Sequence, residues 1–220
     1  MALIFDLDGT LVDSVPLHLK AMRAAMKNAF GENAIPDLFI RDTIRYPLSM
    51  VFKLAKKKYK HVDFSVEAQR KIMRDKANFF NMKNLCALKL FPGVNRMPKL
   101  LKRLDIRFCI VTSMSSNELM KFDQALKLDR ISELIINPPS IRYEKPNPYT
   151  LEEAVKAMRA DKKKTFYVGD SPYDAVASRR AGIGFIGIHN RKELSSKGEF
   201  YVGFPALLKE ILKDPSRFRD

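Results

Sequence analysis

The stretch Ala2-Leu3-Ile4-Phe5-Asp6-Leu7-Asp8-Gly9-Thr10 decides the fold class of this 220-residue chain. Its beginning is apolar, and the run then ends at two acidic residues and a glycine. A short apolar run with this ending is typical of a strand buried on both faces of a parallel sheet. Ligands bind beyond the carboxyl ends of such strands, so Asp6 and Asp8 are the first candidates for chemistry.

Segments with strand and helix patterns alternate after residue 94. We predict strands at 107–112, 133–136, 165–168 and 183–188, and helices at about 94–104, 115–127, 147–158, 172–181 and 204–212. This alternation predicts an α/β fold, a Rossmann-like, doubly wound parallel sheet with helices on both faces.

Residues 14–90 have a different pattern. Apolar residues recur there at helical spacing, Pro36 and Pro47 interrupt them, and we expect three or four helices. Phe91-Pro92-Gly93 is a turn signal that leads back into the alternating pattern. The predicted organisation is an α/β core of residues 1–13 and 91–220, with residues 14–90 as an all-helical cap inserted after the first strand.

The inserted region is also the most basic part of the chain. The formal net charge of the chain is +15, and residues 14–90 hold 16 Lys and Arg against 6 Asp and Glu. A basic excess of this kind fits an anionic partner, large or small. A solvated basic surface is the alternative explanation, and it is the simpler one for the lysines at 53–60.

The composition excludes several classes of protein. No apolar run approaches the roughly 20 residues that a membrane helix needs, and the first residues lack the pattern of a secretory signal. Only two cysteines occur, Cys86 and Cys109, which excludes a disulfide framework. We therefore expect a globular, cytoplasmic protein with no membrane partner.

A second acidic stretch, Gly169-Asp170-Ser171-Pro172-Tyr173-Asp174, follows another predicted strand. Ser171 and Asp174 have the spacing of a capping box, and proline is favoured at the first helical position, so helix-start chemistry explains most of this stretch. It does not explain Asp170. Several carboxylates at one edge of the sheet of a basic protein suggest hard oxygen ligands for Mg²⁺.

Three more polar residues stand at the starts of predicted helices. Thr112 and Ser113 end a predicted strand, where a hydroxyl and free helix amides can hold a phosphate oxygen. An N-cap is the alternative role for this pair. Lys145 precedes another helix and can neutralise an anion, although a lysine in a loop is often only solvated.

Taken in order, these residues resemble the four motifs of the haloacid dehalogenase-like hydrolase superfamily. The matching elements are Asp-x-Asp-Gly-Thr at 6–10, Thr112 after a strand, Lys145 before a helix, and Gly-Asp-x-x-x-Asp at 169–174. The resemblance covers nearly the whole chain. A helical cap after the first strand is typical of the phosphoglycolate phosphatase and β-phosphoglucomutase branch, and residues 14–90 match it in position and character.

The resemblance implies a mechanism for these residues. Asp6 would attack phosphorus and form an aspartyl-phosphate, and Asp8 would act as general acid and then as general base. Asp6, the backbone carbonyl of Asp8, and Asp170 would hold Mg²⁺. The expected function is that of a Mg²⁺-dependent phosphatase acting on a small phosphorylated metabolite.

The resemblance also implies roles for the other motif residues. Thr112, Ser113 and Lys145 would bind the phosphoryl oxygens. Asp174 would support a metal-bound water or orient Lys145.

Two candidates for substrate binding fall in the predicted cap. His18 follows Asp6 by 12 residues, and Arg45 lies in Ile44-Arg45-Tyr46-Pro47. Related capped enzymes often place a histidine and a basic residue in these regions against the substrate. Packing or surface roles are the alternatives for both.

Other functions stay open at this point. A phosphosugar mutase of the β-phosphoglucomutase type shares the motifs, but that branch usually carries Glu where Gly169 stands. A dehalogenase is disfavoured because that branch replaces the second acid of the first motif, and Asp8 is present here. A basic nucleic-acid-binding protein is the alternative of another class; no recognition motif supports it, and we expect no nucleic-acid partner. The sequence does not choose among phosphoglycolate, sugar phosphates, nucleotides and pyrophosphate, or between a monomer and a homodimer.

Overall fold

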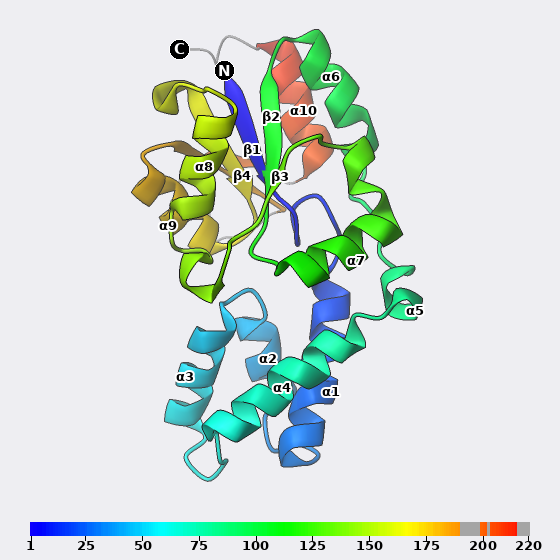
Figure 1. Cartoon of the computed structure of the whole chain (residues 1–220), viewed down its shortest axis with the longest axis vertical. Helices are drawn as coiled ribbons and strands as arrows, with labels where there is room; N and C mark the ends of the chain where they lie inside the picture. The colour runs from blue at the N-terminus through cyan, green and yellow to red at the C-terminus, as the bar shows by residue number, and fades with distance from the viewer. Residues whose placement is uncertain (190–198, 202, 215–220) are drawn as a thin grey trace. The chain divides into compact units, whose positions relative to one another are not determined.

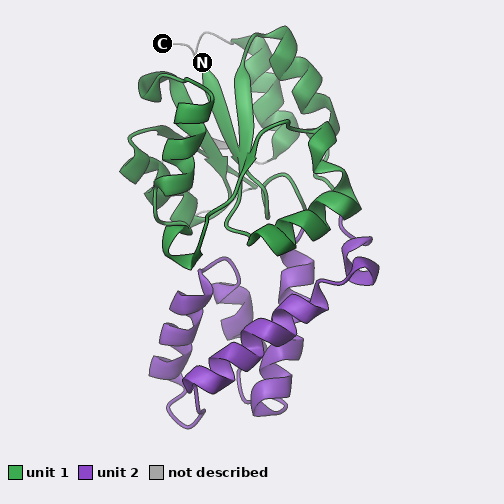
Figure 2. Ribbon diagram, in the orientation of Figure 1, with its two compact units in different colours: residues 1–13, 89–220 green, residues 14–88 purple. Residues whose placement is uncertain are grey.

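The structure, a computed structural model, describes residues 1–189, 199–201 and 203–214. They belong to two compact units (Figure 2). The core unit comprises Met1–Asp13 and Lys89–Asp220, and the helical unit comprises Ser14–Leu88. The part of the predicted core beyond residue 214 lies outside the described residues.

The division between the units falls slightly before the expected boundary at residues 90 and 91. The backbone amide of Asp13 donates to the carbonyl of Lys89 at 2.9 Å, and Val12 forms an antiparallel bridge with Leu90. The two chain segments that join the units are therefore paired with each other inside the core unit.

The core unit is built on a parallel sheet. Within the described residues it has six strands in the order β3-β2-β1-β4-β5-β6, and every neighbouring pair is parallel. The apolar N-terminal run forms the buried strand β1 between β2 and β4. The predicted α/β class with a Rossmann-like parallel sheet is confirmed. The strands are β1 (Ala2–Asp6), β2 (Arg107–Val111), β3 (Ile135–Ile136), β4 (Thr165–Gly169), β5 (Gly184–Ile188) and β6 (Glu199–Tyr201).

Helices cover both faces of this sheet (Figure 1). Ala2 and Ile4 of β1 share one cluster of buried side chains with α8 and α9. On the other face, the ring of Phe5 lies 5.7 Å from the ring of Phe204 in α10. The bounds are α6 (Met97–Arg103), α7 (Ser116–Leu126), α8 (Tyr149–Ala157), α9 (Pro172–Ala181) and α10 (Phe204–Lys213), with 3₁₀ turns η1 (Val94–Arg96), η2 (Leu128–Arg130), η3 (Ile141–Tyr143) and η4 (Lys162–Lys164).

Two strands differ from the sequence-based expectation. The strand expected at 133–136 is reduced to the two residues of β3, and β6 is not predicted at all. Both elements are too short to show an apolar period of their own.

The helical unit, all of whose residues are described, contains five α-helices where three or four are expected. The additional helix is the single turn α5, which the side chain of Asn81 caps by accepting from the amide of Asn84 at 3.1 Å. One cluster of buried apolar side chains joins the four longer helices. The bounds are α1 (Val15–Phe30), α2 (Asp37–Thr43), α3 (Leu48–Lys58), α4 (Val66–Phe79) and α5 (Met82–Leu85).

Among the described residues, none of the helices combines the length and the apolar composition needed to cross a membrane.

Candidate active site

Three neighbouring strands end at the same edge of the sheet. The register pairs Asp6 of β1 with Val111 of β2, and Phe5 with Val168 of β4. Thr112 and Asp170 therefore follow their strands at the level where Asp6 ends β1. Asp6, Thr112 and Asp170 are all buried, with 3%, 1% and 2% of their surface exposed.

The turn after β1 packs closely against Asp170, which follows β4. Gly9 has a φ of +75°, and a Cβ there would lie 2.5 Å from Oδ2 of Asp170. The hydroxyl of Thr10 donates to Oδ2 of Asp6 at 3.2 Å. This close approach needs a residue without a side chain, which explains the glycine in the motif.

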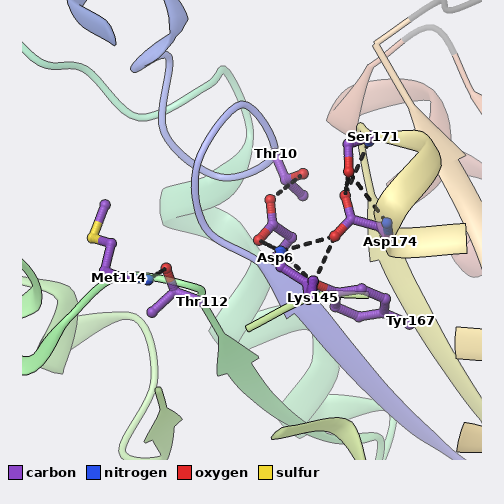
Figure 3. A network of polar contacts seen from close by, with 8 residues as sticks. All are labelled: Asp6, Thr10, Thr112, Met114, Lys145, Tyr167, Ser171 and Asp174. Carbon is purple, nitrogen blue, oxygen red and sulfur yellow. Dashed lines mark hydrogen bonds and ion pairs between the residues drawn. The ribbon is translucent and has the colours of Figure 1, made fainter. Parts of the chain in front are cut away.

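Lys145 connects the acidic residues into one network (Figure 3). Its ammonium donates to Oδ1 of Asp6 at 2.5 Å and lies 2.8 Å from Oδ1 of Asp174. Only 11% of its side chain is exposed. Lys145 is therefore a buried counter-charge inside the cluster, and the solvated alternative is wrong.

Asp174 uses both of its carboxylate oxygens within the protein. Its Oδ2 accepts from the amide of Ser171 at 3.0 Å and from the Ser171 hydroxyl at 2.7 Å. Its Oδ1 lies against Lys145 and accepts from the hydroxyl of Tyr167 at 3.1 Å. A carboxylate offers about four acceptor positions, so the contacts of Asp174 are filled by this chain. The capping box at the start of α9 coexists with the ion pair to Lys145.

Burial dominates the electrostatics of the cluster. It raises the pKa of Asp6 well above its usual range, and the Lys145 ammonium opposes that rise. The neighbouring carboxylates, Asp174 first and then Asp170, raise it further. Burial alone lowers the pKa of Lys145, but the carboxylates beside it raise the value overall, so this lysine stays charged.

The donor set of this edge suits a divalent cation. Carboxylate oxygens of Asp6, Asp170 and Asp174 lie within 4.8 Å of one another, and one lysine does not balance three buried carboxylates. Because the contacts of Asp174 to Ser171, Tyr167 and Lys145 fill its acceptor positions, Asp174 is the least suited of the three to hold a metal directly. Hard oxygen donors of this kind fit Mg²⁺.

The other core candidates follow the ends of β1 and β2. The Oγ1 of Thr112 accepts from the amide of Met114 at 3.1 Å, which is a turn contact two residues along the chain (Figure 3). The N-cap of α7 is Ser115, so the N-cap alternative for Thr112 and Ser113 is wrong. Ser113 and Asp8 are half-buried, and Asp8 forms a β-bridge with Val12.

The two cap candidates belong to the helical unit. His18 lies in α1, where its ring is 4.9 Å from the ring of Phe80, so a packing contact accounts for part of its environment. Arg45 is half-buried in the turn between α2 and α3. The roles of His18 and Arg45 toward a substrate stay predictions.

One member of the network was not singled out from the sequence. Tyr167 lies in β4, is fully buried, and its hydroxyl contacts both Lys145 and Asp174. A signal for it exists, because a tyrosine inside a buried strand needs a partner for its hydroxyl. Sequence patterns do not show which partner it finds.

The fold and the edge cluster together define an α/β enzyme that carries a buried, lysine-paired carboxylate at the end of its central strand. A family model described as haloacid dehalogenase-like hydrolase matches residues 3–188. The chain therefore belongs to the haloacid dehalogenase-like hydrolase family, and the resemblance identified from the motifs is confirmed.

Relatives and solved structures agree with this assignment. A putative pyrophosphatase PpaX of Clostridium perfringens is 26% identical over 217 residues, covering 96% of this chain and 97% of the relative. A phosphoglycolate phosphatase of Haemophilus influenzae is 26% identical over 188 residues, covering 84% and 83%. A hydrolase from Pseudomonas syringae superposes with a TM-score of 0.80 at 23% identity, covering 96% and 98%, and supports the fold. Family membership makes the chain a hydrolase, and the phosphatase-named relatives agree with the enzyme class expected from the sequence.

Proposed function

We propose that this hydrolase is a Mg²⁺-dependent phosphatase that cleaves a small phosphomonoester through an aspartyl-phosphate on Asp6. The observation that carries the proposal is the position of Asp6, a buried carboxylate at the end of β1 with Lys145 at 2.5 Å. The relatives named as phosphatases support the same class of reaction.

The proposed reaction uses two carboxylates of the β1 end. A carboxylate oxygen of Asp6 attacks phosphorus and forms an O–P bond, while the bond between phosphorus and the leaving oxygen breaks. Asp8 gives its proton to that leaving oxygen. Asp8 then takes a proton from water, the water oxygen attacks phosphorus, and the Asp6–phosphorus bond breaks to release phosphate and restore the carboxylate.

The remaining core residues position the phosphoryl group and its charge. Lys145 offers a positive charge beside Asp6, and Thr112 and Ser113 offer hydroxyl and amide donors at the end of β2. Phosphoryl transfer depends mainly on positioning and charge stabilisation, so this set is sufficient in kind. Mg²⁺, held by Asp6, the carbonyl of Asp8 and Asp170, would supply the positive charge that shields an anionic substrate from the attacking carboxylate.

Gly169 favours a hydrolase over a phosphosugar mutase. A Cβ at this position would lie 2.7 Å from atoms of the Asp174 side chain. The glutamate that the mutase branch usually carries there would therefore displace Asp174 from its bonds to Ser171 and Lys145. This chain is built around a residue without a side chain at this point.

The helical unit would recognise the leaving group of the substrate. Its excess of basic residues and the candidates His18 and Arg45 suit a small anionic substrate. Phosphoglycolate and pyrophosphate, which the names of the relatives suggest, are both small and strongly anionic.

A phosphate-release panel tests the proposal. Purified wild-type protein is assayed against p-nitrophenyl phosphate, phosphoglycolate, sugar phosphates, nucleotides and pyrophosphate, with Mg²⁺ and with EDTA. We expect turnover that EDTA abolishes. Asp6→Asn should reduce turnover by at least about a thousandfold, because an amide is a poor nucleophile in this role.

The control is a second Asp→Asn substitution, which makes the same change in charge away from the site. Asp105→Asn removes one carboxylate of the same unit at an exposed position and should leave turnover unchanged. Substantial turnover in Asp6→Asn, or undiminished turnover in EDTA, would refute the proposed mechanism.

A further inference from the structure

Tyr167 lies beside Lys145 in the polar network (Figure 3). Its hydroxyl accepts from Nζ of Lys145 at 2.9 Å and donates to Oδ1 of Asp174 at 3.1 Å. The same ammonium lies 5.6 Å from the centroid of the Tyr167 ring. Burial raises the pKa of Tyr167, so the phenol keeps the proton with which it donates.

The donors of Lys145 can be counted. An ammonium has three N–H donors, and the partners of this one are Oδ1 of Asp6 at 2.5 Å, Oδ1 of Asp174 at 2.8 Å, and the Tyr167 hydroxyl at 2.9 Å. Lys145 can therefore bind a phosphoryl oxygen only by releasing or sharing one of these three contacts.

The three contacts differ in how firmly they are held. Asp174 is fixed by Ser171 at the start of α9, and Tyr167 is fixed by its burial in β4 and by its own bond to Asp174. The two partners therefore support each other on one side of the ammonium. The third N–H of Lys145 points at Asp6, the carboxylate that reacts in the proposed mechanism. This N–H is therefore the one that a phosphoryl oxygen can share.

We propose that Tyr167 is a positioning residue that, together with Asp174, fixes two donors of Lys145 and directs the third at the reacting group. This inference rests on the proposed phosphatase function, and it assigns to Tyr167 a role that acts through Lys145. Without the hydroxyl, one donor of a buried ammonium loses its partner, and the group turns toward the remaining carboxylates.

A double-mutant cycle tests this role. Wild type, Tyr167→Phe, Lys145→Ala and the double variant are compared in kcat and KM for p-nitrophenyl phosphate at saturating Mg²⁺. We expect Tyr167→Phe to lower kcat about tenfold with a smaller change in KM, because positioning matters most when charge develops. We expect the tyrosine substitution to have no further effect in the Lys145→Ala background.

A second substitution controls for the loss of a buried hydroxyl. Thr150 is 1% exposed, and its Oγ1 has no hydrogen-bond partner among the described residues. Thr150→Val should keep wild-type kcat and KM. The thermal unfolding midpoint of every variant, and inhibition by inorganic phosphate, are measured alongside; inhibition should weaken in Tyr167→Phe.

The outcomes separate the inference from the function on which it rests. A wild-type protein without phosphatase activity overturns both. An active wild type with an unaffected Tyr167→Phe, or a cycle in which the two substitutions multiply, overturns only the role of Tyr167. A loss of kcat in Thr150→Val equal to that in Tyr167→Phe also overturns it, since the effect is then not specific to the network.

Discussion

The core unit and the helical unit differ in where they hold their charged side chains. In the core unit the carboxylates of Asp6, Asp170 and Asp174 are at most 3% exposed. In the helical unit no Asp, Glu, Lys or Arg is buried, and its ion pair between Arg23 and Asp37 has side chains 39% and 47% exposed. Buried charges are costly to hold and exposed pairs contribute little, so this contrast separates a unit built for chemistry from one whose charges face solvent.

The apolar packing of the two units does not show this difference. Each unit has its own cluster of buried apolar side chains, and each cluster joins several helices or strands. The distinction arises at the carboxyl ends of β1 and β4 and in the first turn of α9, where the backbone fixes the positions of the buried carboxylates. Such fixed backbone positions can hold carboxylates close together, whereas the charged side chains of the helical unit are spread over its surface.

The cysteines, one in each unit, give the largest expected contrast. Cys109 is buried in β2, and burial raises its pKa to about 12, whereas Cys86 is exposed in the helical unit. At pH 8 a thiol with this pKa has a thiolate fraction about a thousandfold below that of a thiol at the ordinary value. We expect iodoacetamide to modify Cys86 in the native protein and Cys109 only in denaturant, as measured by peptide mass spectrometry.

The raised pKa of Cys109 also makes the stability of the fold depend on pH. Above pH 9.0 the thiol of the unfolded chain ionises, while the folded one stays neutral until the pH approaches about 12. The free energy of unfolding therefore falls as pH rises through that window. Equal rates of modification for both native cysteines would contradict the closed packing of the core unit.

Asp170 gives the next largest effect. We expect Asp170→Ala to raise the Mg²⁺ concentration for half-maximal activity by about a hundredfold, because the proposed metal site loses one of its two carboxylates. The measurement is a Mg²⁺ titration of phosphate release. Asp129→Ala, which removes an exposed carboxylate of the same unit, should not shift the titration. An unshifted curve for Asp170→Ala would remove this residue from the site.

Gly9 and Gly182 have similar φ angles but different surroundings, so they separate the effect of backbone strain from that of a close contact. Gly9 has a φ of +75° and Gly182 a φ of +72°, but a Cβ meets Asp170 only at Gly9, and nothing lies within 4 Å of it at Gly182. Alanine at either position costs about 1 kcal/mol of backbone strain. We expect Gly182→Ala to lose only that stability, and Gly9→Ala also to lower kcat/KM about tenfold. Equal activities of the two variants would mean that the contact with Asp170 does not matter.

Sequence patterns predict the core unit better than the helical unit, and the reason is physical. A parallel strand must be apolar and must end at a fixed edge, so the roles of β1, β2 and β4 and the positions of Asp6 and Asp170 follow from short runs of residues. Tyr167 escapes such reasoning because both partners of its hydroxyl, Lys145 and Asp174, lie outside its own strand. β3 and β6 escape it because they are too short to show a period.

In the helical unit, sequence patterns predict the helices but not the residues that contact a substrate. Helical spacing predicts its helices and misses α5, but it says nothing about which exposed side chains a substrate meets. His18 and Arg45 are therefore candidates by resemblance and remain predictions. Their test has to be functional.

Arg45 gives the smallest expected effect and tests whether the helical unit takes part in recognition. We expect Arg45→Ala to raise KM several-fold for the best substrate of the panel and to leave KM for p-nitrophenyl phosphate nearly unchanged, because a cap residue that reads the leaving group has nothing to read in a generic aryl ester. Lys57→Ala, which removes one exposed positive charge from α3, controls for the long-range field of this unit. If both variants raise KM equally for both substrates, the contribution of the helical unit is its charge alone. If only Arg45→Ala raises KM for the best substrate more than for p-nitrophenyl phosphate, the helical unit takes part in choosing the substrate. The buried carboxylates of the core unit then act on a substrate that exposed or half-buried charges of the helical unit select.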